Sequence, residues 1–273
     1  MNIFKTDPAI GIVFLITNVL LITNFSFKNG LPTCDNYVFN VYLYLTMSCI
    51  IFYLFLFVHN KAIFSKENEK EILPHNEVWE KYKNHFIFQF IGLIFCLIML
   101  LSYMPTYFTK KDSSILAISH LLYITLLYFL SGLSITYFKS DKYYKYITEA
   151  GKIVLSIFAV MSGVVYSFPS FFEKTFSYIY PALVVSLFVT ILFTIITLFT
   201  SNKRDFLSTQ KIISYILIGI CSLFISYDTQ RVFYNSKLCN VNRIANYPSE
   251  GLTFFLDVLN IFKRILFIRG FND

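Results

Sequence analysis

The chain has 273 residues, of which 56% are hydrophobic and only 14% are charged, and its formal net charge is +7. A soluble globular domain is about a quarter charged, so the surplus apolar side chains of this chain must face lipid. The positive charge does not indicate nucleic-acid binding, because no basic stripe and no known nucleic-acid motif accompanies it. Composition therefore favours an integral membrane protein.

Eight apolar runs follow one another along the chain. A spanning helix needs about 20 mainly apolar residues, and lipid cannot satisfy an open backbone, so we expect each run to be helical. The sequence therefore predicts an all-α, polytopic membrane helical bundle. The runs are Pro8 to Phe25, Tyr37 to Val58, Phe86 to Tyr107, Ser114 to Phe138, Ile153 to Phe168, Tyr178 to Thr200, Ile212 to Tyr227 and Gly251 to Ile268.

The first run, Pro8 to Phe25, could be mistaken for a cleaved signal peptide. It lacks a strongly basic start and a small-residue cleavage site, so we expect a retained helix. We accordingly divide the chain into residues 1–36, an extra N-terminal membrane segment with its loop, and residues 37–273, a seven-helix membrane domain.

The longest polar segment runs from His59 to His85 and mixes lysines with glutamates. We expect a solvated connector with a surface helix near Glu77 to Lys83, and a regulatory loop is the alternative. His59, His75 and His85 lie in or beside this segment, and their spacing matches no standard metal site.

The Lys/Arg balance predicts the orientation. If all eight runs cross and the N-terminus is cytoplasmic, sixteen of the 23 basic residues fall on the inner side. Alternating crossings then place the loops with Cys34 and Cys239 together on the outer side, where a disulfide between them is a hypothesis. Cys49, Cys96 and Cys221 lie inside apolar runs and are predicted to be small core residues.

The last two runs carry carboxylates. Asp257, Asn260 and Arg264 share one helical face of the eighth run. A charge at the bilayer centre costs at least a few kcal/mol, so we expect this face to turn toward other helices or water. Asp228 closes the seventh run. It is either an interfacial acid at a helix end or a partner of Asp257.

If Asp228 and Asp257 meet, their chemistry is specific. Two carboxyl groups in a low-dielectric site resist ionising together, so they can share one proton and titrate as a pair. The shared proton would hold the helices together, and its loss would part them or admit a cation. Carboxylate oxygens suit a hard cation such as calcium.

The same residues resemble a known family. The C-terminal third is similar to the transmembrane Bax inhibitor motif, or lifeguard, family. The similarity rests on Ser226-Tyr227-Asp228-Thr229-Gln230, on Phe255-Leu256-Asp257-Val258-Leu259-Asn260-Ile261-Phe262 and, more weakly, on Asn40-Val41-Tyr42-Leu43-Tyr44-Leu45-Thr46.

This resemblance implies a seven-helix bundle with the last helix central. It also implies a calcium-permeable, pH-sensitive leak in the endoplasmic reticulum, Golgi or plasma membrane, linked to suppression of cell death. Asp228 and Asp257 would form the pH sensor and bind calcium transiently, with no other metal, no cofactor and no enzymatic step. The supporting polar residues would be Tyr227, Asn260, Arg264 and His120. Arg264 would substitute for an arginine that some members carry in their second helix.

Two other classes of function stay open. A non-conducting scaffold that binds other membrane proteins would use the two aspartates only to lock helix packing. An intramembrane aspartyl protease also carries an acid in a Tyr-Asp pair, which Tyr227-Asp228 fits. The second acid of such a protease follows Gly-x-Gly, whereas Asp257 follows Phe255-Leu256.

Overall fold

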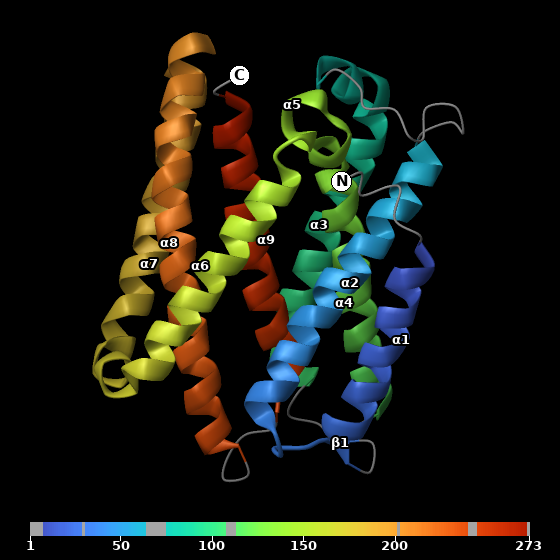
Figure 1. The fold of residues 1–273 in the computed structure, drawn as a ribbon, viewed down its shortest axis with the longest axis vertical. Coiled ribbons are helices and arrows are strands. Elements are labelled where there is room, and N and C mark those ends of the chain that lie inside the picture. The colour runs from blue at the N-terminus through green and yellow to red at the C-terminus, as the bar shows by residue number, and fades with distance from the viewer. Residues whose placement is uncertain are drawn as a thin grey trace. The chain divides into compact units, whose positions relative to one another are not determined.

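The computed structural model describes residues 8–28, 31–63, 75–107, 113–200, 203–239 and 245–271, and these are mostly helical (Figure 1). The helices are α1 (Pro8–Phe25), α2 (Tyr37–Ile63), α3 (His75–Tyr107), α4 (Ser113–Lys139), α5 (Asp141–Tyr144), α6 (Ile147–Ser167), α7 (Pro169–Thr200), α8 (Lys203–Leu238) and α9 (Tyr247–Phe271). Strands β1 (Phe27–Lys28) and β2 (Leu31–Pro32) pair antiparallel. The predicted all-α, polytopic helical bundle is confirmed.

Each apolar run coincides with a long helix, but most helices extend beyond their run. Only α1 has the predicted bounds. The expected separate surface helix near Glu77 to Lys83 is instead the first part of α3, which begins at His75. The seventh run predicted a helix that ends at Tyr227. This end is wrong, because α8 continues to Leu238. Residues 64–74 of the expected charged connector lie outside the described residues.

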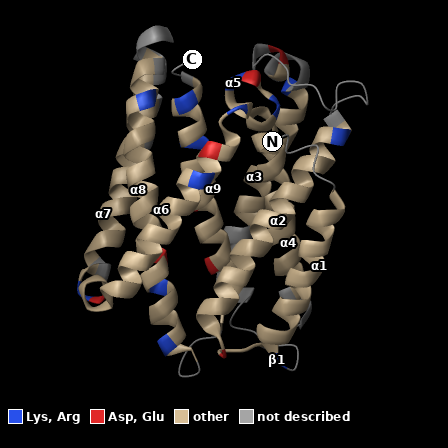
Figure 2. Cartoon of the chain, viewed as in Figure 1, with Lys and Arg blue, Asp and Glu red and all other residues tan. Residues whose placement is uncertain are grey.

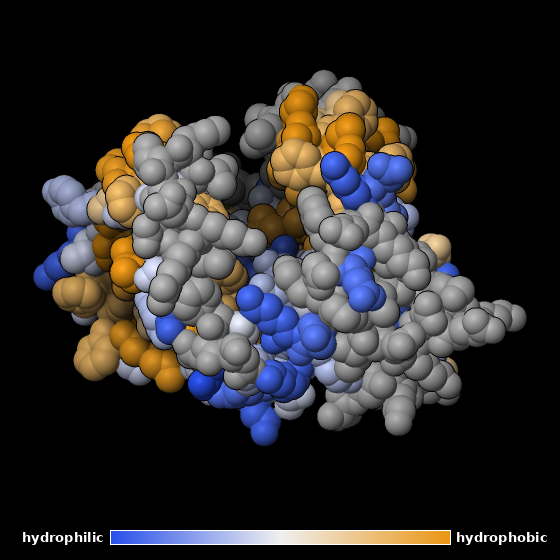
Figure 3. All heavy atoms as spheres, turned by 90° about the horizontal axis from the view of Figure 1, so that it is seen from above, coloured by the Kyte–Doolittle hydropathy of each residue, from blue (hydrophilic) through white to orange (hydrophobic). Residues whose placement is uncertain are grey.

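Five described helices are long and apolar enough to cross a membrane: α1, α2, α4, α6 and α8. The bent helix α7 makes a sixth if its two parts form one span, and α3 contains a shorter apolar stretch, Lys83–Met99. By length and composition α9 falls short, because polar residues interrupt its apolar face. Figure 3, which looks onto one end of the helices, shows hydrophobic side chains along their flanks, as expected for helices that face lipid.

The chain folds as two compact units. Unit 1 comprises residues 1–144 and 235–252, and unit 2 comprises residues 145–234 and 253–273. In unit 1, α2 packs against α1 and α4, and α4 packs against α3. The additional N-terminal helix is therefore joined to the helices that follow it.

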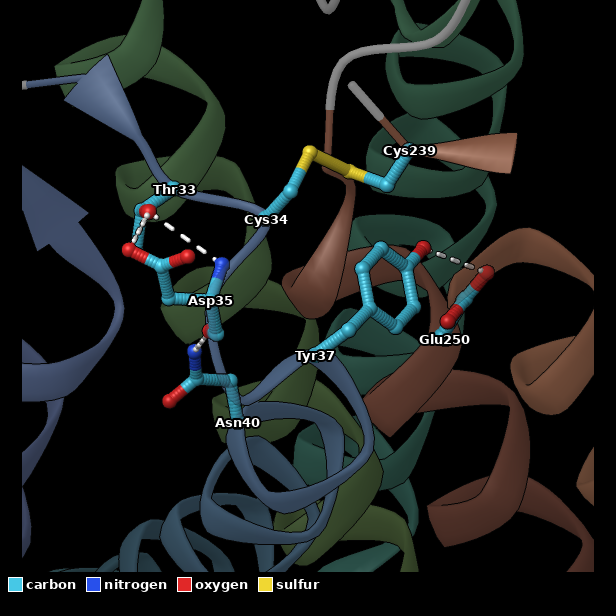
Figure 4. The surroundings of a disulfide bond; sticks show 7 residues. All are labelled: Thr33, Cys34, Asp35, Tyr37, Asn40, Cys239 and Glu250. Carbon is cyan, nitrogen blue, oxygen red and sulfur yellow. Dashed lines mark hydrogen bonds between the residues drawn. A yellow bond between two sulfur atoms is a disulfide. The ribbon is translucent and has the colours of Figure 1, made fainter. Parts of the chain in front are cut away.

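A disulfide between Cys34 and Cys239 closes one end of unit 1, with the two Cα atoms 5.6 Å apart (Figure 4). The predicted pairing is confirmed. Beside it, the Tyr37 hydroxyl donates a hydrogen bond of 3.0 Å to Glu250 Oε1, and the side-chain amide of Asn235 donates to the same oxygen. These contacts hold the start of α2, the end of α8 and the start of α9 together.

Gly251 marks the closest approach between α9 and α2. A Cβ atom at this position would lie 2.7 Å from Tyr44 Cβ and 3.0 Å from the backbone nitrogen of Leu45, neither of which is a flexible side-chain end. We therefore expect Gly251→Ala to destabilise the protein by about 1–3 kcal/mol, the usual cost of overpacking.

The matched control is Gly219→Ala on α8, where a Cβ would meet no atom within 4 Å. Because alanine is the better helix former, this change should be neutral or stabilising by up to about 1 kcal/mol. Thermal unfolding of the purified variants, followed by circular dichroism, measures both effects. Equal melting temperatures for the two variants would contradict the close approach.

Candidate functional site

Charged residues are scarce along the middle of most helices. Figure 2 shows long uncharged stretches, with charged residues concentrated near helix ends and exceptions part-way along α8 and α9. Asp228 lies on α8 and Asp257 on α9, and both belong to unit 2. A carboxylate so placed needs a partner, since an unpaired charge is costly away from water.

The structure brings these two acids together. The carboxyl groups of Asp228 and Asp257 lie within hydrogen-bonding range of each other. Asp228 is only 1% exposed. Because a carboxylate has no proton to donate, a hydrogen bond between the two groups requires that one of them is protonated. The geometry therefore suits a pair that shares a proton.

Arg231 supplies the positive charge at this pair. One of its terminal nitrogens lies 3.3 Å from Asp228 Oδ1, one helical turn away on α8. The same nitrogen lies 3.4 Å from the Thr253 hydroxyl on α9. The guanidinium thus contacts both helices that carry the acids, and it neutralises one carboxylate when both are ionised.

Four consecutive residues of α8 reach three other helices. The Ser226 hydroxyl donates to the Met161 carbonyl of α6 at 3.3 Å, and the Thr229 hydroxyl lies 3.2 Å from that of Ser162 on α6. Between them, Tyr227 stacks on Tyr180 of α7 with ring centroids 4.8 Å apart. Asp228 points to α9. Successive helical residues point in different directions around the axis, so this arrangement requires α8 to be surrounded by α6, α7 and α9 within unit 2.

The acid pair retains unused hydrogen-bonding capacity. Within the described residues, Oδ2 of Asp228 and Oδ2 of Asp257 are buried and have no hydrogen-bond partner. Two buried oxygen acceptors that lack donors are what a proton, a water molecule or a hard cation would satisfy.

The other predicted supporting residues are placed differently. Tyr227 is half-buried against α7, whereas Asn260 is exposed. Arg264 lies within electrostatic range of Cys221 on α8. His120 belongs to unit 1, where its Nε2 lies 2.9 Å from the Tyr44 hydroxyl beside a cavity of about 310 Å³. The direct contact between two predicted site residues is the one between Asp228 and Asp257.

Sequence reasoning missed Arg231. The apolar run ends at Tyr227, so the residues beyond it were not expected to continue the helix. In the structure α8 continues to Leu238, and Arg231 lies one turn beyond Asp228 on the same face. The signal was present in the sequence: an acid and an arginine three residues apart form an ion pair if the helix continues.

The fold and these contacts define a polytopic helical membrane protein in which two acids on neighbouring helices meet beside an arginine. The family model described as inhibitor of apoptosis-promoting Bax1 matches residues 34–273, so the chain belongs to this family. The resemblance drawn from the last two helices is thereby confirmed, and the match begins after α1, β1 and β2. No curated protein and no solved structure matches the chain.

Proposed function

We propose that this protein is a pH-sensitive calcium leak gated by the pair Asp228 and Asp257. The observation that carries the proposal is the direct approach of the two carboxyl groups, each with a buried Oδ2 that lacks a partner. No enzymatic step and no cofactor is part of this proposal. Calcium is the transported ion and occupies the pair only in transit.

Counting charges explains the pH dependence. With one proton on the pair, Arg231 balances the remaining carboxylate and the cluster is neutral, so α8 and α9 stay joined. Without that proton the cluster carries an excess negative charge in a low-dielectric setting, where repulsion between carboxylates is strong. The helices then separate at the acids, or a cation enters between them. Flux should therefore rise as pH rises.

Arg231 has to yield when a cation arrives, because like charges repel. Its contact with the Thr253 hydroxyl provides a second place for the guanidinium on α9. The carboxylate oxygens of Asp228 and Asp257 are the hard ligands that calcium prefers over softer donors. We infer that Arg231 moves from Asp228 toward Thr253 as calcium enters.

The disulfide supports a location for the leak. Disulfides persist where one face of a membrane meets an oxidising compartment. We therefore place the Cys34–Cys239 end toward the lumen of the endoplasmic reticulum or Golgi, or toward the cell exterior. A calcium leak in such a membrane would alter cytosolic calcium, and modulation of cell death would follow from that change.

The test is calcium flux into proteoliposomes across a pH series. Wild-type flux should increase roughly tenfold over the two pH units in which the pair loses its shared proton. The Asp228→Asn/Asp257→Asn double variant cannot ionise there, so its flux should not respond to pH. Asp141→Asn, which changes an exposed acid on the short helix α5, is the matched control and should behave like wild type.

A scaffold that does not conduct is the second candidate, and the ion pair of Arg231 with Asp228 favours it. In that case the acids and the arginine would only fix helix packing, and partners would be other membrane proteins. The same flux series separates the two functions. Flux that equals that of empty liposomes at every pH would remove the leak and leave the scaffold. A pH response retained by the double variant would show that the acid pair does not gate the leak.

A further inference from the structure

A second group of polar side chains lies in unit 1, where α2 ends and α3 enters its apolar part. The rings of His59 on α2 and His85 on α3 have centroids 5.3 Å apart. Gln89 lies one helical turn after His85, on the same face of α3. His59 and Gln89 are fully buried, whereas His85 is half-buried and gives the group access from outside.

The hydrogen bond of His59 determines which ring nitrogen is free. Its Nε2 lies 3.0 Å from the backbone carbonyl oxygen of Tyr128 on α4. A carbonyl only accepts, so Nε2 carries the proton and Nδ1 presents a lone pair. Among the described residues this Nδ1 is buried and has no partner. A metal-binding histidine is usually held in this way, with its other nitrogen donating to a carbonyl.

His85 and Gln89 provide further donor atoms without partners. Within the described residues, His85 Nε2 and both polar atoms of the Gln89 amide are buried and make no hydrogen bond. Gly132 on α4 makes the room for that amide, since a Cβ there would lie 2.8 Å from Gln89 Oε1. Gly132 is one turn beyond Tyr128, so His59 and Gln89 contact the same side of α4.

Four unpartnered polar atoms in one small region are energetically costly. A buried polar atom without a partner loses its hydrogen bonds to water, and native proteins pair nearly all such atoms. Two imidazole nitrogens and an amide oxygen suit a borderline ion such as zinc. Zinc binds histidine nitrogen at about 2.0–2.1 Å in a tetrahedral arrangement, which sets the two ring centroids roughly 5 Å apart.

We propose that His59 Nδ1, His85 Nε2 and Gln89 Oε1 form a binding site for a divalent transition-metal ion of the zinc class. Among the described residues no group of three His, Cys, Asp or Glu is placed to hold a metal ion, so the amide completes the protein ligands. Water would take the remaining position at the half-exposed side of His85. The ion would join α2 to α3 at the end of unit 1 that lies opposite the disulfide.

The test is titration of the purified full-length protein with Zn²⁺, followed by calorimetry, and with Co²⁺, whose visible absorption reports tetrahedral coordination. We expect one saturable site per chain. His85→Ala should weaken binding roughly tenfold or more, and Gln89→Leu should weaken it less. His120→Ala is the matched control, because His120 is hydrogen-bonded to Tyr44, and it should bind Zn²⁺ like wild type.

Thermal stability gives a second measurement that does not depend on a buried variant folding well. Zn²⁺ should raise the melting temperature of wild type and of His120→Ala, because an ion that binds only the folded state stabilises that state. It should not raise that of His85→Ala. If wild type shows neither saturable Zn²⁺ binding nor a higher melting temperature with Zn²⁺, the proposal is overturned. That result would mean that water fills the region. Equal loss in the His85 and His120 variants would overturn it as well.

Discussion

Arg231→Gln is expected to destabilise the protein by roughly 2–4 kcal/mol, because it leaves Asp228 buried without its counter-charge. The side chain of Asp228 is 2% exposed and that of Arg231 is 27% exposed. This loss of stability is at the low end of the range for breaking a buried ion pair, because water reaches Arg231 and the Asp228 carboxyl group can take up a proton. Thermal unfolding in detergent, followed by circular dichroism, measures the loss.

Two further variants identify the cause of that loss. Lys237→Gln removes the same charge from an exposed position on α8, and we expect less than about 0.5 kcal/mol. Arg231→Gln combined with Asp228→Asn removes both charges and should recover most of the stability. If the double variant is no more stable than Arg231→Gln alone, the arginine acts through packing and the ion pair is not the reason.

Breaking the disulfide is expected to cost about 2–5 kcal/mol, because the bond closes a very long loop. Its cysteines are separated by 205 residues. Cys34→Ala, Cys239→Ala and the double variant should lose the same stability, since each removes the same bond. Reductant should lower the melting temperature of wild type to the same value and leave the variants unchanged.

Cys49→Ala is the control for this series, because Cys49 is a free cysteine on α2. The prediction that it is a core residue is wrong, since its side chain is exposed, whereas Cys96 and Cys221 are buried as predicted. Cys49→Ala should retain both wild-type stability and the sensitivity to reductant. Electrophoresis with and without reductant provides an independent measurement, since only chains that hold the bond should change mobility. A wild-type protein whose melting temperature ignores reductant would contradict a stabilising disulfide.

Apolar runs predicted the helices well but their ends poorly. Hydropathy detects the part of a helix that lies in hydrocarbon, whereas hydrogen bonding along the backbone continues into polar residues. This is why α3 begins at His75 and α8 extends to Leu238, beyond the apolar runs that predicted these helices. The same limitation concealed Arg231, which lies in the polar continuation of α8.

The two acids were found from sequence because a carboxylate in an apolar run is rare and therefore informative. Their contact was an open alternative, since sequence does not give the rotation of α8 relative to α9. The arrangement of His59, His85 and Gln89 was not foreseen. Metal-site patterns rely on short spacings along one segment, whereas these residues come from two helices that meet in space.

The bond between Cys34 and Cys239 also imposes a parity rule on the membrane topology. Residues whose Cα atoms are 5.6 Å apart lie at the same membrane face, so the intervening chain crosses an even number of times. Of the described helices between them, α2, α4, α6 and α8 are long and apolar enough to be spans. If these four cross, the bent α7 and the shorter apolar stretch of α3 must traverse together or not at all. Fixing the sidedness of either one, by labelling a single introduced cysteine, fixes the other.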